Sequence, residues 1–273
     1  MSTLEAIILG CGSSGGVPRL GGPDNAGYWG ACDPANPKNR RTRCSLLVRR
    51  KGQGGETNVL VDTSPDMREQ LLAARCATLD GVLITHDHAD QLNGFDDLRM
   101  VSINMRRRVD VYSDGAAIEG MLARFGYCFV QPEGSGYPPI VTGHAIAEPF
   151  EIFAIDGAGG AISVRAFGQV HGRIRSLGFR FGPLAYSSDV NRLDESAFDA
   201  LAGVECWIVD TLRYAPHPSH AHLALALEWI ARVRPKRAIL TNLHTDLDYG
   251  TLRNELPAGV EPAYDGMRIT LGV

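Results

Sequence analysis

The sequence has few aromatic residues, no excess of basic residues and no long apolar run. Aromatic residues make up 7% of its 273 residues, and the formal net charge is −4 at pH 7. Without a positive field, a phosphate-bearing partner has to be bound locally rather than by an extended basic surface. The first residues, MSTLEAIILG, carry no basic segment, and no stretch is long enough to span a bilayer. We therefore expect a cytoplasmic protein that does not associate with a membrane.

Paired cysteines are also missing, because none of the six cysteines forms a C-x-x-C motif. In a chain of this size, such scattered cysteines indicate reduced thiols rather than a disulfide framework. The hydrophobic fraction of 44% is sufficient for a large core. We expect residues 1–273 to form a single domain.

Short β-rich runs bounded by turn residues recur along the chain, and amphipathic helical segments lie between several of them. The strands cluster in two halves, roughly 4–113 and 150–244, which predicts a four-layer αββα sandwich. In SPDMREQLLAAR, Ser64 is a candidate N-cap and Pro65 the first helical residue. The predicted strands are 5–10, 44–50, 58–64, 81–86, 109–114, 150–155, 161–168, 177–182, 184–189, 206–211 and 238–243. The predicted helices are 64–75, 95–104, 115–126, 194–202, 221–233 and 250–256.

The segment GCGSSG, residues 10–15, matches the G-x-G-x-x-G pattern of dinucleotide-binding folds. That pattern requires a helix directly after the glycines, because the helix N-terminus binds the pyrophosphate. Here GVPRLGGPDN follows, and its proline and glycines cannot open a helix. We expect a tight loop, followed by a long irregular stretch over 21–43 of the kind that often has a function.

The segment GVLITHDHADQLNG, residues 81–94, places several metal-binding side chains directly after an apolar run. In an extended chain His86 and His88 point the same way, so that both imidazoles can bind one ion, and Asp90 can approach as the chain turns. Imidazole and carboxylate ligands suit zinc, manganese or iron.

This segment resembles the H-x-H-x-D-H signature of the metallo-β-lactamase superfamily. Further signature positions follow in order: Asp62 in VLVDTS, His171 in FGQVHG and Asp189 in LAYSSD. The resemblance covers nearly the whole chain. GCGSSGGVPR, YSSD and YDGM narrow it towards the branch with the cyclic phosphodiesterase of the carbon-phosphorus lyase pathway and, more distantly, the tRNA 3′-processing endonucleases. It implies hydrolysis of phosphodiesters and a role for Asp62 in orienting the metal-binding loop.

Two positions depart from the signature. Gln91 replaces its last histidine, and Asn242 stands where the family has a histidine after a strand threonine. Both lost ligands belong to the second metal, for which His244, two residues beyond Asn242, is a substitute if the chain is extended there. An oxygen-rich second site shifts the preference from zinc towards manganese or magnesium, and the site can also bind weakly or stay empty. The resemblance implies one or two divalent ions, manganese or zinc, with His86, His88, His171 and Asp189 at the first site and Asp90, Asp189 and His244 at the second.

Three histidines lie in YAPHPSHAHLALALEW, just ahead of a predicted helix. In the related phosphodiesterases an H-x-D segment here supplies a histidine that protonates the leaving oxygen. This chain has H-x-H, with His220 at the acid position and His222 in place of the aspartate. Histidine suits the task because its pKa lies near neutrality. For His217 and His222, capping the helix or supporting another group is an equally good interpretation.

Three further positions bear on the site. Arg173 follows the third histidine and Arg99 follows the metal loop, so either can contact a phosphate through its guanidinium group, although a solvated surface position is the commoner place for each. Cys32 lies where the lyase-pathway enzyme has a structural zinc site. Its partner cysteine is missing and Thr245 replaces a histidine, so we expect no structural zinc.

The leading hypothesis is a metal-dependent phosphodiesterase that acts on small cyclic phosphodiesters or nucleotides, with attack by a metal-bound hydroxide. Asp90, His220 and His222 are its candidate catalytic residues. A polynucleotide substrate is disfavoured, because the acidic chain shows no basic arm to hold one. Two alternatives stay open: an enzyme of the quinone-cofactor biosynthesis type, and a nucleotide-binding protein with an impaired second metal site. The oligomeric state is open, with a homodimer as one option.

Overall fold

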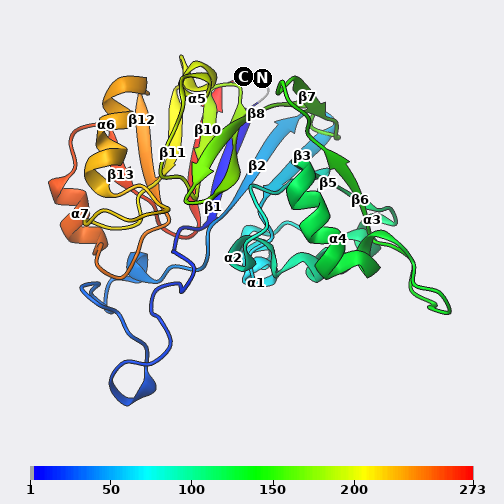
Figure 1. Ribbon diagram of the computed structural model, residues 1–273, viewed down its shortest axis with the longest axis horizontal. Coiled ribbons are helices and arrows are strands. Elements are labelled where there is room, and N and C mark those ends of the chain that lie inside the picture. The colour runs from blue at the N-terminus through cyan, green and yellow to red at the C-terminus, as the bar shows by residue number, and fades with distance from the viewer. Residues whose placement is uncertain (1–2, 273) are drawn as a thin grey trace. The chain divides into compact units, whose positions relative to one another are not determined.

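The computed structural model describes residues 3–272 and divides into two compact units. One unit comprises residues 3–7, 45–164 and 268–272, and the other residues 8–44 and 165–267. The strands form two seven-stranded sheets, whose elements are labelled in Figure 1. No described helix is long and apolar enough to cross a membrane.

The first sheet has the strand order β14-β1-β2-β3-β4-β5-β6. β2 and β3 form an antiparallel hairpin, whereas β3 to β6 pair in parallel. Parallel neighbours need crossover connections, and helices α1 to α4 provide them. The strands are β1 (Thr3–Gly10), β2 (Ser45–Gly52), β3 (Gly55–Val61), β4 (Gly81–Leu83), β5 (Val109–Ser113), β6 (Val141–Ala145) and β14 (Met267–Gly272), and the helices are α1 (Met67–Ala74), α2 (Ala89–Leu92), η3 (Phe95–Asp97), α3 (Leu98–Met105) and α4 (Gly115–Phe129).

The start of α1 differs from the prediction. Met67 is its first residue and Asp66 its N-cap, whereas Ser64 and Pro65 lie outside the helix. The Ser64 carbonyl accepts from Met67 N at 2.9 Å, and its hydroxyl accepts from Asp66 N at 3.2 Å. Ser64 therefore closes a turn one step before the helix, which is a common use of a serine side chain.

The second sheet has the order β13-β12-β11-β10-β9-β8-β7. β8, β9 and β10 pair antiparallel, and β10 to β13 pair in parallel. Helices α5, α6 and α7 make the crossovers between the parallel strands. The strands are β7 (Ile152–Ile155), β8 (Ile162–His171), β9 (Ile174–Phe181), β10 (Leu184–Ser187), β11 (Cys206–Asp210), β12 (Arg237–Thr241) and β13 (Val260–Pro262), and the helices are α5 (Glu195–Leu201), α6 (Leu223–Val233) and α7 (Tyr249–Glu255).

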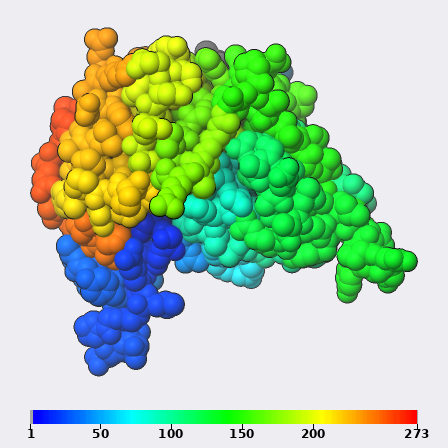
Figure 2. All heavy atoms as spheres, in the orientation of Figure 1, coloured from blue at the N-terminus to red at the C-terminus, as the bar shows by residue number. Residues whose placement is uncertain are grey.

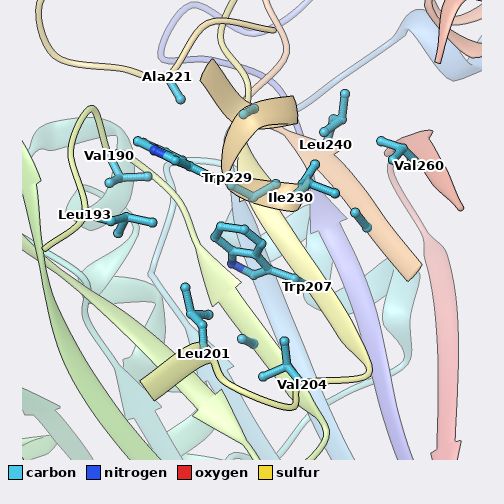
Figure 3. Close-up of a cluster of buried hydrophobic side chains, with 14 of the residues drawn as sticks. Val190, Leu193, Leu201, Val204, Trp207, Ala221, Trp229, Ile230, Leu240 and Val260 are labelled. Carbon is cyan, nitrogen blue, oxygen red and sulfur yellow. The ribbon is translucent and has the colours of Figure 1, made fainter. Parts of the chain in front are cut away.

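The core of the second unit is built around two tryptophans (Figure 3). Trp207 on β11 is fully buried, and its Nε1 donates to Ser187 Oγ at 3.0 Å. Trp229 on α6 is 7% exposed and packs in the same cluster with the apolar residues of β12 and α5. These contacts hold α6, and with it the loop that precedes this helix.

The loop after β1 is irregular, as the sequence predicted. The first helical turn after GCGSSG is a three-residue 3-10 turn, η1 (Pro23–Asn25), and a second one, η2 (Pro37–Asn39), follows. In Figure 2 the early part of this loop is a dark blue arm that stands out from the rest of its unit, and Leu20 is fully exposed on it. Near the end of the loop, the buried guanidinium of Arg41 donates to the carbonyl oxygens of Leu247 (2.7 Å) and His244 (3.1 Å). These bonds tie the loop to the segment that follows β12.

Parallel strands align their carboxyl ends at one edge of a sheet, and ligand-binding residues gather at such edges. In the first unit, Asp62 follows β3 and His86 lies in the loop after β4. In the second unit, Asp189 follows β10, Asp210 ends β11 and Asn242 follows β12. Asp62, Asp189 and Asn242 have φ angles of 64°, 52° and 62°. Aspartate and asparagine adopt this left-handed conformation more readily than most residues, so the three turns fit their residue types.

Candidate metal centre

The two histidines of the first unit lie in the loop after β4. His86 is 2% exposed, and its ring centroid is 4.5 Å from that of His88 with an interplanar angle of 72°. His88 is the N-cap residue of α2, where the extended chain turns into the helix. The two imidazoles therefore lie beside each other at the carboxyl end of β4.

Asp62 and Thr85 fix the ring of His86. Asp62 is fully buried and accepts from Thr85 N at 2.8 Å and from Thr85 Oγ1 at 3.0 Å. Because an ionised carboxylate can only accept, the Thr85 hydroxyl donates to it and accepts from His86 Nδ1, which is 3.0 Å away. Nδ1 of the neutral ring is then protonated and Nε2 carries the lone pair that a metal ligand needs.

The short helix α2 contains two further signature positions. Asp90 is half-buried in its first turn, and Gln91 is 1% exposed. Asp87, in the same loop, is held by an ion pair of 2.7 Å with Arg124 on α4. Of the two aspartates in this segment, Asp87 is thus tied to α4, and Asp90 is the candidate metal ligand.

In the second unit, His171 ends β8 and is 4% exposed. Its Nδ1 lies 2.7 Å from the carbonyl oxygen of Ser219. A carbonyl only accepts, so Nδ1 donates and Nε2 carries the lone pair of the neutral ring. Nε2 lies 3.9 Å from Oδ1 of Asp189, which is 2% exposed.

His220 lies in the loop before α6, next to Ser219. Its Nδ1 is 3.0 Å from Oδ2 of Asp210 and 3.8 Å from Oδ1 of Asp189. Its ring meets that of His171 edge-on, with centroids 4.7 Å apart. One donor atom from each of His171, Asp189 and His220 lies within 4.8 Å of the other two.

This donor set fits a divalent cation. Two imidazole nitrogens and one carboxylate oxygen are typical ligands of zinc and also suit manganese. Ligands held at about 2.0–2.2 Å from a common ion lie roughly 3–4 Å apart. Small side-chain movements therefore suffice to bring the three donors onto one ion.

The side chain of Asn242, just after β12, hydrogen-bonds to Asp210 at the end of β11. It is 1% exposed, its Nδ2 donates to Asp210 Oδ1 at 3.0 Å, and the same atom lies 3.1 Å from His220 Nδ1. Asp210 is fully buried, and its Oδ2 also accepts from Val190 N at 3.0 Å. Asp210 was not predicted. The repeated V-D-T at residues 61–63 and 209–211 could have identified it, because both aspartates follow a buried strand and support a histidine.

His244 takes a different position from the predicted one. The prediction assumed an extended chain beyond Asn242, but φ of 62° at that residue turns the backbone, so the alternation of sides ends there. Within residues 3–272, no group of three metal-binding donors includes His244. Its Nδ1 pairs with Asp246 Oδ1 at 2.6 Å, and burial together with the charge of Arg19 lowers the pKa of the ring.

Three predicted residues remain. His222 is the N-cap residue of α6, and its side chain makes no capping hydrogen bond. Arg173 is exposed in the turn between β8 and β9, two residues from His171. Arg99 on α3 forms an ion pair with Asp96 one turn earlier.

A sequence profile described as the β-lactamase superfamily domain matches residues 57–242, more than half of the chain. The chain belongs to the β-lactamase superfamily. It is 30% identical over 268 residues to an octanoyltransferase of Porphyromonas gingivalis, covering 97% of this chain and 51% of the relative. It is 28% identical over 174 residues to the coenzyme PQQ synthesis protein B of Bradyrhizobium diazoefficiens, covering 60% and 52%. The chain thus spans about half the length of these curated relatives.

Solved structures share the fold of this superfamily member. A diphosphatase of the PhnP family superposes with a TM-score of 0.85 at 28% identity, covering 99% of this chain and 98% of that one. Zinc-bound PqqB of Methylobacterium extorquens gives 0.68 at 16% identity over 98% and 100% of the two chains. Human short-form tRNase Z gives 0.63 at 16% identity over 98% and 100%. The predicted metallo-β-lactamase fold is confirmed, and the family and its neighbours indicate a hydrolase of this superfamily.

Proposed function

We propose that the protein is a metal-dependent phosphodiesterase that acts on small phosphate esters, such as cyclic phosphodiesters or nucleotides. The observation that carries this proposal is the buried donor group of His171, Asp189 and His220 at the strand ends of the second unit. The similarity to a PhnP-family diphosphatase over nearly the whole chain supports phosphoryl chemistry. The octanoyltransferase relative is about twice as long, so its acyl transfer is not what we propose here.

In this proposal His86, His88 and Asp90 are the candidate ligands on one unit and His171 and Asp189 those on the other, with His220 beside Asp189, and one or two divalent ions are bound. When bound, such ions activate a water molecule and neutralise the charge that develops on phosphoryl oxygens. The chain's own groups fix these ligands: Asp62 acts through Thr85, and the Ser219 carbonyl holds His171. Fixed rings present Nε2 in one orientation, which lowers the cost of arranging the site for reaction.

Substrate binding is proposed to involve Arg173. This side chain is exposed and lies two residues from His171, where a guanidinium group can contact a phosphate. Arg99 is the weaker candidate, because its ion pair with Asp96 already uses its charge. The net charge of −4 favours a small substrate over a polynucleotide. The cytoplasmic location and the homodimer stay predictions.

The test combines metal content with turnover. Protein purified without added metal is analysed by mass spectrometry, and hydrolysis of bis(p-nitrophenyl) phosphate is followed with added Mn²⁺ or Zn²⁺. We expect one or two ions per chain and cleavage that depends on the added metal. Bound metal without cleavage of any phosphodiester would contradict the phosphodiesterase assignment and leave only the metal site.

Two other functions keep a specific observation in their favour. Similarity to coenzyme PQQ synthesis protein B favours a role in quinone-cofactor biosynthesis, and such an enzyme would cleave no phosphodiester. Gln91 and Asn242 favour a nucleotide-binding protein whose second metal site is impaired. Equilibrium dialysis with a cyclic nucleotide in the presence of Mn²⁺ or Zn²⁺ separates these cases, since only the binding protein retains this phosphodiester without cleaving it.

A further inference from the structure

The position that the superfamily resemblance assigns to the last histidine ligand is held by Asn242, and this side chain is already engaged. Its Nδ2 donates to the buried Asp210 at 3.0 Å, and the residue is 1% exposed. An amide is also a weaker metal ligand than an imidazole, since it offers only a neutral oxygen. The strand end of β12 therefore supplies no strong ligand of its own.

His220 is in the chemical state that this missing ligand requires. Its Nδ1 lies 3.0 Å from Oδ2 of Asp210, and a buried carboxylate can only accept. Nδ1 of the neutral ring therefore carries the proton, and Nε2 carries the lone pair. The alternative tautomer, with Nδ1 accepting from Asn242 at 3.1 Å, would place a nitrogen lone pair against the carboxylate. The charge of Asp210 decides between the two tautomers in favour of the first.

The loop before α6 places His220 beside the other donors of its unit. Ser219 accepts from His171 Nδ1 at 2.7 Å, so consecutive residues of this loop fix one ring and provide the next. The rings of His171 and His220 are 4.7 Å apart, and both belong to the donor group with Asp189.

We infer that His220 is a metal ligand through Nε2 and replaces the ligand lost at Asn242. In this arrangement Asp210 is a positioning residue that sets the tautomer of His220, and the Asn242 amide anchors Asp210. The inference rests on the metal-dependent part of the proposed function. It replaces the acid role that the sequence predicted for His220, and it makes the second unit's site a His-Asp-His set.

Metal binding tests this without reference to activity. The wild-type chain and the variants His220→Ala, His220→Gln and His217→Ala are titrated with Zn²⁺ against a chromogenic chelator, and with Co²⁺ for its visible absorption. We expect both His220 variants to lose an ion or to bind it more than about 100-fold more weakly. The loss of a residue that only orients a ligand weakens metal binding by about 10- to 100-fold, so a larger effect indicates a ligand. His217→Ala is the matched control, since its ring lies 5.1 Å from that of His220 in the same loop but outside the donor group. Wild-type Zn²⁺ affinity and Co²⁺ spectrum are expected for it.

Two further variants distinguish the loss of the ligand His220 from the loss of the groups that position it. Asp210→Asn removes the charge that fixes the tautomer, and we expect about 10- to 100-fold weaker Zn²⁺ binding with an unchanged number of ions. Asn242→His in the His220→Ala background returns an imidazole to the family's position, and we expect it to recover most of the lost affinity. The urea unfolding midpoint of each variant, measured without metal, shows that each one is folded.

Wild-type metal binding by the His220 variants would overturn the inference. If folded His220→Ala and His220→Gln both bind Zn²⁺ and Co²⁺ as the wild type does, His220 is not a ligand. An acid role then shows as slow cleavage of esters with alkyl leaving groups and normal cleavage of p-nitrophenyl esters. If the metal results are as expected and no phosphodiester is cleaved by the wild type, the proposed function fails while the ligand assignment stands.

Discussion

At the scale of single residues, each unit uses a buried acceptor to set the tautomer of a histidine. Asp62 acts on His86 through the hydroxyl of Thr85, whereas Asp210 acts on His220 directly. An oxygen accepts a hydrogen bond from Nδ1 in each case, the Thr85 hydroxyl for His86 and the Asp210 carboxylate for His220, so that Nε2 of the neutral ring carries the lone pair. Such orienting partners raise both the basicity and the positional precision of a metal ligand.

Thr85→Val tests this relay in the first unit. The variant keeps the shape of the side chain but removes the hydroxyl between Asp62 and His86, and Thr85 is fully buried. We expect about 10- to 100-fold weaker Zn²⁺ binding and a loss of roughly 1–3 kcal/mol in the free energy of unfolding, because buried polar groups lose a partner. Chelator competition and urea denaturation measure the two effects.

The matched control for Thr85→Val is Thr63→Val. Thr63 is also fully buried, and its hydroxyl donates to the Leu92 carbonyl at 3.3 Å rather than to the relay. It is expected to lower stability while Zn²⁺ affinity stays at the wild-type value. Equal losses of Zn²⁺ affinity in both variants would mean that general loosening, and not the relay, weakens binding.

Sequence reasoning singled out candidate metal ligands at this scale but not the groups that support them. His86, His88, His171 and Asp189 stand out by motif, whereas the Ser219 carbonyl does not. A backbone carbonyl carries no sequence signal, and Asp210 shows only through the repeated V-D-T, which by itself indicates no function. The conformation of Asn242 also decided the position of His244, and no residue-level rule distinguishes an extended asparagine from a left-handed one.

At the scale of elements, each predicted strand corresponds to an observed one, and three observed strands were not predicted. The missing strands β6, β13 and β14 are all edge strands. Their burial patterns mix buried with half-buried or exposed residues. An edge strand has only one paired neighbour, so it needs less of the continuous apolar pattern by which a central strand is recognised. The four-residue helix α2 is likewise too short for its periodicity to show.

The N-terminus of α7 gives a prediction for acid stability. Burial alone would raise the pKa of its N-cap residue, Asp248, but hydrogen bonds from Thr251 N, Asp33 N and Asn39 Nδ2 outweigh it and lower the pKa to about 2. An unfolded aspartate titrates near about 3.9. Because the folded pKa is the lower one, the stabilisation is present above pH of about 4 and is lost as the pH falls towards 2.

Asp248→Asn is therefore expected to flatten this part of the stability profile. Its free energy of unfolding, from urea titrations between pH 5 and pH 2, should fall less steeply than that of the wild type. Asp24→Asn, at an exposed residue of the loop after β1, serves as the control and is expected to follow the wild-type profile. A wild-type slope in Asp248→Asn would show that other carboxylates govern the acid limb.

At the scale of the whole molecule, the proposed function places candidate ligands on each unit, so metal binding should stabilise each unit that holds an ion. An ion present at 100 times its dissociation constant adds about 2.7 kcal/mol, which corresponds to a rise in Tm of roughly 5–10 °C for a chain of this size. Hydrogen exchange should slow in the loop before α6, and also in the loop after β4 if His86 and His88 hold an ion. The variant His171→Ala should lose the shift, whereas His144→Ala, whose ring pairs with Asp110 at 2.8 Å on the first unit, should keep it. Protection confined to the loop before α6 would mean that the second unit binds the ion alone, and the His86 and His88 pair would then need another role.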